Sequence, residues 1–321
     1  MPRLSKLQQA CRSALIDYLG VTEDETLLII TDENYRDIAN EFLKIAQGIC
    51  KEVIYTEMLP RKFNGEEPPE AIAEAMKAVD AIIAPTTMSL THTKARLKAS
   101  DLGVRIATMP SIKEDTLIRC LSADANKLVE RTHSLFMRMR GTREIYIETR
   151  IGTAFTMPIK RRKIFESTGV LKTIGDAGNI PSGEVYISPN EDMSYGTIVF
   201  DGSIAGIGML KENVIVEIKK GKIKNISGGK QAKQFEEMLK SVGDERAFCV
   251  AEFGIGTNDK AQICGEILED EKVMGTAHVA FGNNITMGGI LNVPIHVDGL
   301  ITKPDIYFDK KQIMKFGEFI Y

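Results

Sequence analysis

Features that mark a membrane-bound, secreted or nucleic-acid-binding protein are missing from this 321-residue sequence. No stretch approaches the run of about 18 apolar residues that a membrane-spanning helix needs. The first twenty residues contain no uninterrupted apolar segment and no small-residue cleavage site, so they do not resemble a secretory signal. The formal net charge is only -3, which gives no global attraction to nucleic acid or to an anionic membrane. We therefore expect a cytoplasmic protein with neither of these partners.

Cysteine is also scarce. The five cysteines are odd in number, scattered along the chain and without a C-x-x-C pair. This pattern suits a reducing compartment and argues against a disulfide framework or a zinc site built from thiolates. The cysteines in apolar segments, such as Cys249 and Cys264, are therefore interpreted as small buried hydrophobic residues.

The first part of the chain alternates strand and helix patterns. Predicted strands lie at 26–31, 51–58, 80–85 and 103–109, and predicted helices at 36–50, 69–79 and 89–100. This alternation predicts a parallel sheet covered by helices. A long amphipathic helix at 122–140 is expected to lead into the second half.

From about Arg143 the pattern becomes β-rich, with short strand-like segments separated by Gly, Asn, Asp and Pro and a single helix at 230–241. These segments predict one mixed or antiparallel sheet system. The expected fold is thus an α/β N-terminal domain with a parallel sheet, residues 1–142, followed by a β-rich α+β metal-binding domain, residues 143–321.

Two of the four histidines lie in strand-like segments of the Gly-rich C-terminal part, GTAHVAFGNN and VPIHVDGL. In the second segment His296 and Asp298 are two residues apart, so on a strand both side chains project from the same face. A divalent metal of hard or borderline character needs such an imidazole and carboxylate. The H-x-D pair alone is a weak signal, and His278 supplies a further nitrogen nearby in sequence.

Two glutamates strengthen the metal hypothesis. Glu252 lies inside an apolar strand, FCVAEFGIGTN, where an unpaired carboxylate costs several kcal/mol. A bound cation would compensate it, and an ion pair with a distant Arg or Lys is the alternative. Glu184 follows a Pro-Ser-Gly turn at the start of another strand, where an exposed carboxylate is the simpler interpretation. Together these N and O donors predict one or two zinc-like ions that activate water and polarise a carbonyl group.

The ordered segments PSGEVYISP, AEFGIGTN, DEKVMGTAHVAFG and PIHVDG resemble the metallo-aminopeptidases typified by thermophilic aminopeptidase T. The segment SLTHTKARLKASDLGVRIATMPSI resembles the N-terminal domain of that family, so the resemblance covers most of the chain. It implies two divalent ions, zinc or cobalt, with ligands Glu184, Glu252, His278, His296 and Asp298. Glu271 resembles another acidic position near the metals, at an altered spacing. The resemblance also implies a homodimer.

The sequence departs from that family at one point. A tyrosine follows the H-x-A-x-G motif in the family's peptidases, whereas Gly282-Asn283-Asn284-Ile285-Thr286 follows it here. The same fold also serves an iron-dependent dioxygenase that acts on dihydroxypyridines. For that enzyme, His278, His296 and Asp298 would form a 2-His-1-carboxylate set for Fe(II).

Three hypotheses follow. The first is a hydrolase that removes N-terminal residues from small peptides, with Glu184 or Glu252 as the catalytic proton shuttle. The second is a ring-opening dioxygenase with one iron ion and dispensable glutamates. The third is a member that binds metal without catalysis. The sequence favours the metallo-aminopeptidase.

Overall fold

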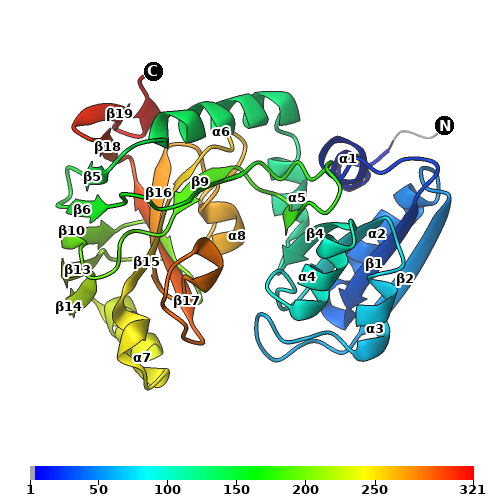
Figure 1. Ribbon diagram of the computed structural model, residues 1–321, viewed down its shortest axis with the longest axis horizontal. Coiled ribbons are helices and arrows are strands. Elements are labelled where there is room, and N and C mark those ends of the chain that lie inside the picture. The colour runs from blue at the N-terminus through cyan, green and yellow to red at the C-terminus, as the bar shows by residue number, and fades with distance from the viewer. Residues whose placement is uncertain (1–3) are drawn as a thin grey trace. The chain divides into compact units, whose positions relative to one another are not determined.

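A computed structural model describes residues 4–321 of the chain, which separates into two compact units (Figure 1). The first unit runs to Val129 and also contains Thr168–Ser182, and the second comprises Glu130–Ser167 and Gly183–Tyr321. These two units differ in two places from the division that the sequence predicted between residues 142 and 143. Helix α6 (Ala125–Met139) crosses the new division, and the segment after residue 167 returns to the first unit.

The first unit is built on a parallel five-stranded sheet with the order β2-β1-β3-β4-β8. Its strands are β1 (Thr26–Asp32), β2 (Glu52–Met58), β3 (Ala81–Thr86), β4 (Arg105–Pro110) and β8 (Ala177–Asn179). Its helices are α1 (Lys6–Ser13) with a π turn (Ala14–Tyr18), α2 (Arg36–Ala46), α3 (Glu70–Ala75), α4 (Lys94–Asp101) and α5 (Glu114–Cys120). Strand β1 is apolar at consecutive positions because helices cover the sheet on both faces.

The second unit contains two antiparallel sheets. The eight-stranded sheet has the order β14-β13-β10-β6-β5-β18-β19-β20, and the seven-stranded sheet has the order β12-β11-β17-β16-β15-β9-β7. The first consists of β5 (Glu144–Glu148), β6 (Ala154–Pro158), β10 (Tyr195–Phe200), β13 (Val214–Lys219), β14 (Lys222–Ser227), β18 (Asp305–Phe308), β19 (Lys311–Lys315) and β20 (Glu318–Phe319). The second consists of β7 (Ile164–Ser167), β9 (Glu184–Ile187), β11 (Ser203–Ile204), β12 (Gly208–Met209), β15 (Val250–Gly256), β16 (Thr276–Gly282) and β17 (His296–Thr302). Helices α7 (Lys230–Ser241) and α8 (Ile267–Asp270) complete this unit.

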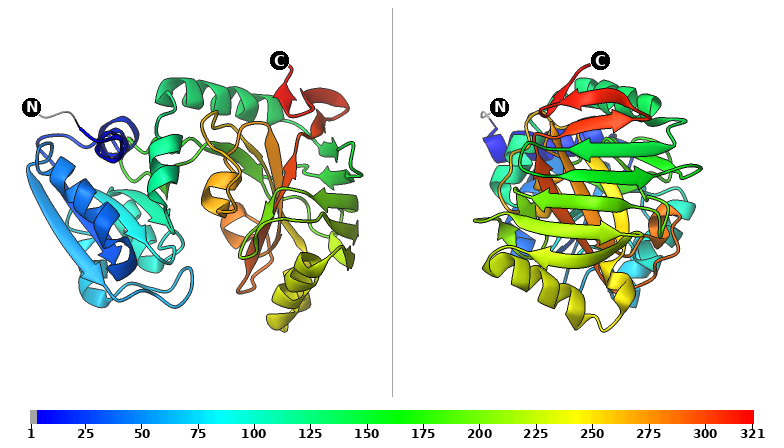
Figure 2. Two further views of the ribbon diagram at one scale, coloured as in Figure 1. Left: turned by 180° about the vertical axis from the view of Figure 1, so that it is seen from behind. Right: turned by 90° about the vertical axis from the view of Figure 1, so that its left-hand side faces the viewer.

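Alternation along the strands creates one core between the two sheets. Residues such as Val185, Phe253, Ile255 and Val279 point from the seven-stranded sheet into a buried apolar cluster. The opposite face of the eight-stranded sheet is seen in the right-hand view of Figure 2, with α6 along one edge and α7 along the other. Only one face of the seven-stranded sheet is therefore used for the core, which leaves its other face for polar side chains.

A β-bulge decides where Glu252 points. The pairing of β15 with β16 shifts register between Val250 and Glu252. Regular alternation would direct both residues to the same face, but the extra residue turns Glu252 away from the core that contains Val250 and Phe253. Glu252 is thereby placed on the polar face.

The expected fold class is confirmed: a parallel sheet with helices precedes an antiparallel, sheet-rich part. The second part forms two sheets, where the sequence predicted one sheet system. Within residues 4–321, no helix has both the length and the hydrophobicity needed to span a membrane.

Truncation of Phe235 on α7 tests the core. Its ring is 1% exposed and meets Phe200 edge-on at a centroid distance of 6.4 Å. We expect Phe235→Ala to lower the free energy of unfolding by about 3–5 kcal/mol through lost burial and a residual cavity. Urea unfolding measures this change. Met193→Ala, at a side chain that is 54% exposed, should stay within about 0.5 kcal/mol of the parent, and an equal loss in both variants would contradict the assignment.

Candidate metal centre

Four neighbouring strands of the second unit, β9, β15, β16 and β17, carry the predicted site residues on one face. Glu184 begins β9, Glu252 lies on β15, His278 lies on β16, and β17 supplies His296 and Asp298. The strands are hydrogen-bonded in the order β17-β16-β15-β9, and their side chains converge because all of these residues point away from the core. The structure therefore brings together all five of these residues.

The donors form two connected groups. In one group, ligand atoms of Glu184, Glu271 and His278 all lie within 4.8 Å of one another, and in the other the same holds for Glu252, His296 and Asp298. His278 joins the groups, because its Nε2 lies 3.4 Å from Glu184 Oε2 and 3.6 Å from Glu252 Oε1.

His296 has the orientation of a metal ligand. Its Nδ1 lies 2.7 Å from the carbonyl oxygen of Asn283, which assigns the ring proton to Nδ1 as the donor. Nε2 then faces Glu252 Oε2 at 3.2 Å and Asp298 Oδ2 at 3.6 Å, and in the neutral ring it is the nitrogen available to a metal ion. A backbone acceptor that fixes the tautomer in this way is typical of metal-binding histidines.

Several buried polar atoms at this site have no hydrogen-bond partner in the structure. They are Glu184 Oε2, both ring nitrogens of His278 and Asp298 Oδ1. His278 is 0% exposed and Asp298 is 7% exposed. An unsatisfied buried polar atom costs about 1–3 kcal/mol, so four of them beside one another require compensation. A divalent cation that prefers nitrogen and oxygen ligands fits these atoms.

The negative charge of the cluster changes the proton affinities within it. Burial favours neutral imidazoles, but the surrounding carboxylates outweigh this effect, raising the pKa of His278 to about 9 and that of His296 well above its ordinary value. Burial likewise opposes ionisation of Glu252, yet hydrogen bonding from His296 and the positive charge of both histidines hold its pKa far below the usual range. Without a metal, protons on the histidines therefore balance the carboxylates.

Gly254 makes room for His278. The two residues are paired across β15 and β16, and a Cβ atom built at Gly254 would lie 2.1 Å from His278 Nε2. No side chain fits at this position while the imidazole occupies its observed place.

Two side chains at the site were not predicted. Lys272, 2% exposed, has its Nζ 2.6 Å from Glu184 Oε1 and also donates to Glu271. Tyr186 lies on the same face of β9 as Glu184, and its ring stacks on Phe165 at a centroid distance of 5.1 Å. Both had a signal in the sequence, since Lys272 follows Glu271 and Tyr186 is two residues after Glu184.

Glu271 belongs to the first donor group, and burial raises its pKa to about 8 despite the opposing charge of Lys272. The other two histidines lie elsewhere. His133 is on α6, where its Nδ1 is 3.1 Å from Glu166 Oε2, and His92 precedes α4 in the first unit.

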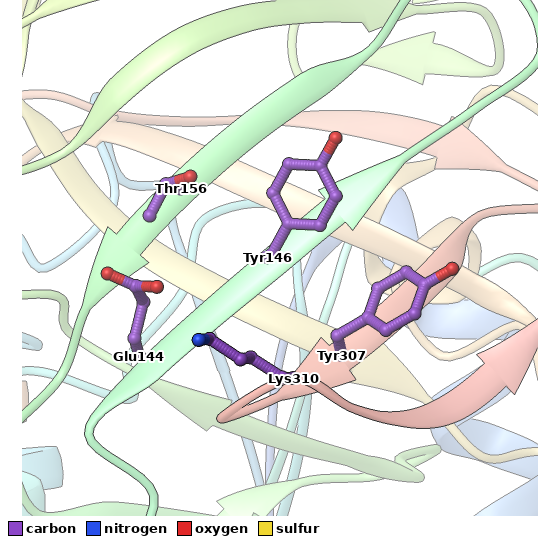
Figure 3. Close-up of a pocket in the computed structure, with 5 residues that line it drawn as sticks. All are labelled: Glu144, Tyr146, Thr156, Tyr307 and Lys310. Carbon is purple, nitrogen blue, oxygen red and sulfur yellow. The ribbon is translucent and has the colours of Figure 1, made fainter.

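A separate hollow of about 340 Å³ opens on the eight-stranded sheet (Figure 3). Tyr146 and Tyr307 line it, and both phenol groups donate to Glu148, at 3.1 and 2.9 Å. None of the clustered donors lines this hollow.

These features define a class of two-unit proteins that carry clustered nitrogen and oxygen donors at one β-sheet face. Within this class, the chain belongs to the NicX family, described as 2,5-dihydroxypyridine 5,6-dioxygenase, whose model matches residues 6–321. A 2,5-dihydroxypyridine 5,6-dioxygenase of Pseudomonas putida is 26% identical over 262 residues, which cover 78% of this chain and 73% of the relative.

Solved structures agree on the fold. The structure of the 2,5-dihydroxypyridine dioxygenase from Pseudomonas putida KT2440 has a TM-score of 0.84 at 22% identity, over 99% of this chain and 98% of that chain. Wild-type AmpT from Thermus thermophilus has a TM-score of 0.71 at 14% identity, over 98% and 99% of the two chains.

The assignment to the metallo-aminopeptidases is therefore wrong, and so are the hydrolase class and the peptide-cleaving activity that followed from it. The aminopeptidase T likeness is one of fold, whereas the family model identifies dioxygenase relatives. The motifs misled because they report a donor arrangement on a shared fold, and a fold does not by itself specify the chemistry. The absent tyrosine was the feature that pointed away from the peptidases.

Gly254→Ala should weaken metal binding while the protein still folds. The added methyl group must displace the His278 ring, and we expect the dissociation constant for Zn(II) to rise about 10- to 100-fold. Isothermal titration calorimetry on metal-free protein measures this change. Gly48→Ala, where the nearest atom would lie at an ordinary 3.6 Å, is the matched control. Unchanged affinity in Gly254→Ala would remove His278 from the site.

Metal binding should release protons at pH 7. Both histidines have raised pKa values, so they are protonated in the metal-free chain at this pH and must become neutral to bind a cation. Affinity should therefore fall as the pH is lowered, by about tenfold per pH unit for each proton released. Calorimetry in two buffers of different ionisation enthalpy counts the protons, and a count of zero would contradict the assigned charge states.

Proposed function

We propose that this protein is an iron-dependent dioxygenase that opens the ring of a dihydroxypyridine or a closely similar electron-rich heteroaromatic compound. The observation that carries the proposal is the convergence of His278, His296 and Asp298 with Glu252 on one sheet face, in a chain of the NicX family. Two imidazoles and a carboxylate form the ligand set of non-haem Fe(II) oxygenases.

The donors fit one Fe(II) ion. When bound, the iron supplies the one-electron chemistry that allows dioxygen to react with an electron-rich ring. The NicX relatives are named for cleavage between positions 5 and 6 of 2,5-dihydroxypyridine. In such a reaction the C5–C6 bond breaks and both atoms of one O₂ enter the product, as a carboxyl group at C5 and a formyl group at C6. The atoms balance without a further reductant.

The remaining residues of the site would handle the substrate and its proton. Glu184 Oε2 has no hydrogen-bond partner and lies beside His278, so we assign it as the acceptor of a ring-hydroxyl proton. Glu252 Oε2 lies 3.2 Å from His296 Nε2, which makes Glu252 a further ligand to the same ion. The dioxygenase hypothesis drawn from the sequence left both glutamates dispensable. This proposal instead gives Glu184 and Glu252 roles at the site.

An aromatic pair on the same sheet face supports a planar substrate. Phe165 and Tyr186 are paired across β7 and β9, and their rings are nearly parallel, with an interplanar angle of 12°. Tyr186 is paired with Gly254, the residue that also faces His278. A flat ring held beside the donors could stack on this pair, a contact worth about 0.5–1.5 kcal/mol beyond its buried area.

The expected cytoplasmic location and homodimer stay predictions.

The test is oxygen consumption. Metal-free protein is loaded with Fe(II) under anaerobic conditions and then mixed with 2,5-dihydroxypyridine in air-saturated buffer. We expect one O₂ consumed per ring lost, followed with an oxygen electrode and by ultraviolet absorbance. Asp298→Asn removes a ligand charge and should lower kcat/KM by about 10³-fold, equivalent to roughly 4 kcal/mol.

His133→Ala is the matched control, since this histidine is 56% exposed and bonded to Glu166, and it should keep full activity. An iron-loaded protein that consumes no oxygen with any dihydroxypyridine would overturn the proposed function. Equal activity of Asp298→Asn and the parent would overturn the proposed ligand set.

A further inference from the structure

Lys272 is a buried cation within the donor cluster. Its side chain is 2% exposed, its Nζ lies 2.6 Å from Glu184 Oε1, and it also donates to Glu271 Oε1. Lysine is almost never this buried unless it is paired. Here the pairing uses two of the three residues in the first donor group, Glu184, Glu271 and His278.

Backbone contacts fix the position of the Lys272 main chain beside the site. The amide of Lys272 donates to Glu269 O at 2.9 Å, and its carbonyl accepts from Asn258 at 2.8 Å. On β15, Gly256 lies so close that a Cβ atom there would be 2.7 Å from the carbonyl carbon of Lys272. The lysine is therefore held against the site sheet by backbone contacts, independently of its ion pairs.

A metal ion in the first donor group would have to share its carboxylates with this lysine. Metal–carboxylate distances are about 2.0–2.2 Å, so an ion bound to Glu184 and Glu271 would lie within about 7 Å of Nζ, even on the carboxylate oxygen that Lys272 does not contact. At such a distance in a buried site, a divalent ion and an ammonium group repel each other strongly. The second group, Glu252, His296 and Asp298, contains no lysine or arginine among its described contacts.

We propose that the Lys272 ammonium group occupies the position of a second cation, and that it thereby limits the cluster to one metal ion, bound by Glu252, His296 and Asp298 together with His278, which joins the two groups. Lys272 therefore determines how many metal ions the cluster binds. This inference takes the identity of the ion from the proposed function. The number of ions per chain does not depend on that function.

The charges are consistent with a single ion. The cluster holds four carboxylates, from Glu184, Glu252, Glu271 and Asp298, and one ammonium group. With all four carboxylates ionised and both imidazoles neutral, one divalent ion leaves a net charge of -1, whereas two would leave +1 in a largely buried environment. Loss of the lysine charge would instead leave the cluster neutral with two ions, so its removal should create a second binding site.

The experiment counts metal ions in the purified protein. Metal-free protein is titrated with Zn(II), a probe without redox chemistry, and the bound ions are counted by native mass spectrometry and calorimetry. We expect one ion per chain in the parent and two in Lys272→Gln, which keeps a hydrogen-bond donor but loses the charge. Lys272→Arg keeps the charge and should bind one ion.

Two further variants complete the design. In the double variant Lys272→Gln/Glu271→Gln the first group loses a ligand, and the count should return to one. Lys260→Gln, at a side chain that is 49% exposed, is the control for a lysine change outside the cluster and should also bind one ion. Thermal unfolding monitors whether each variant is folded.

Two ions in the parent protein would overturn the proposal without the need for any variant. It would also be overturned by a folded Lys272→Gln variant that binds a single ion. The count with Zn(II) is independent of oxygen consumption, so one ion in the parent and two in Lys272→Gln would support Lys272 even if no dihydroxypyridine reacts.

Discussion

Four carboxylates and two imidazoles lie close together at one sheet face of the second unit, and carboxylates this close cannot all stay ionised unless cations lie among them. The structure supplies one such cation in Lys272, whose ammonium group pairs with Glu184 and Glu271. The remaining negative charge raises the pKa of His278 and His296, and several buried polar atoms of the site have no hydrogen-bond partner. This concentration of negative charge is the feature on which both the metal hypothesis and its limit to one ion depend.

The antiparallel register determines where that charge is concentrated. Gly254 lies between Tyr186 on one side and His278 on the other, and it must lack a side chain because the imidazole fills the space above it. The bulge after Val250 turns Glu252 to the same face. The other face of these strands is packed into the sandwich core, so the donors rest on a surface that the core holds rigid. Such support is what a first shell of ligands needs.

The chemistry is decided by finer differences than the fold. AmpT of Thermus thermophilus and the Pseudomonas putida dioxygenase both resemble this chain in fold, and the motifs that carry donors are compatible with either chemistry. The family model separates them. Hydrolysis and ring opening both need a cation held by nitrogen and oxygen ligands, so a donor list reports the metal site rather than the reaction.

The sequence by itself determined the order of elements, because hydrophobic periodicity is local: the pattern at 26–31 became β1, and helix α7 has the predicted bounds Lys230–Ser241. It also indicated Glu184, Glu252, His278, His296 and Asp298, since a buried carboxylate or an H-x-D pair is visible in a short segment. Only the tertiary structure decided that β8 completes the first sheet and that Lys272 neutralises part of the cluster. Strand register, the bulge at Glu252 and the approach of Lys272 to Glu184 depend on contacts between residues far apart in sequence, and no local pattern specifies these.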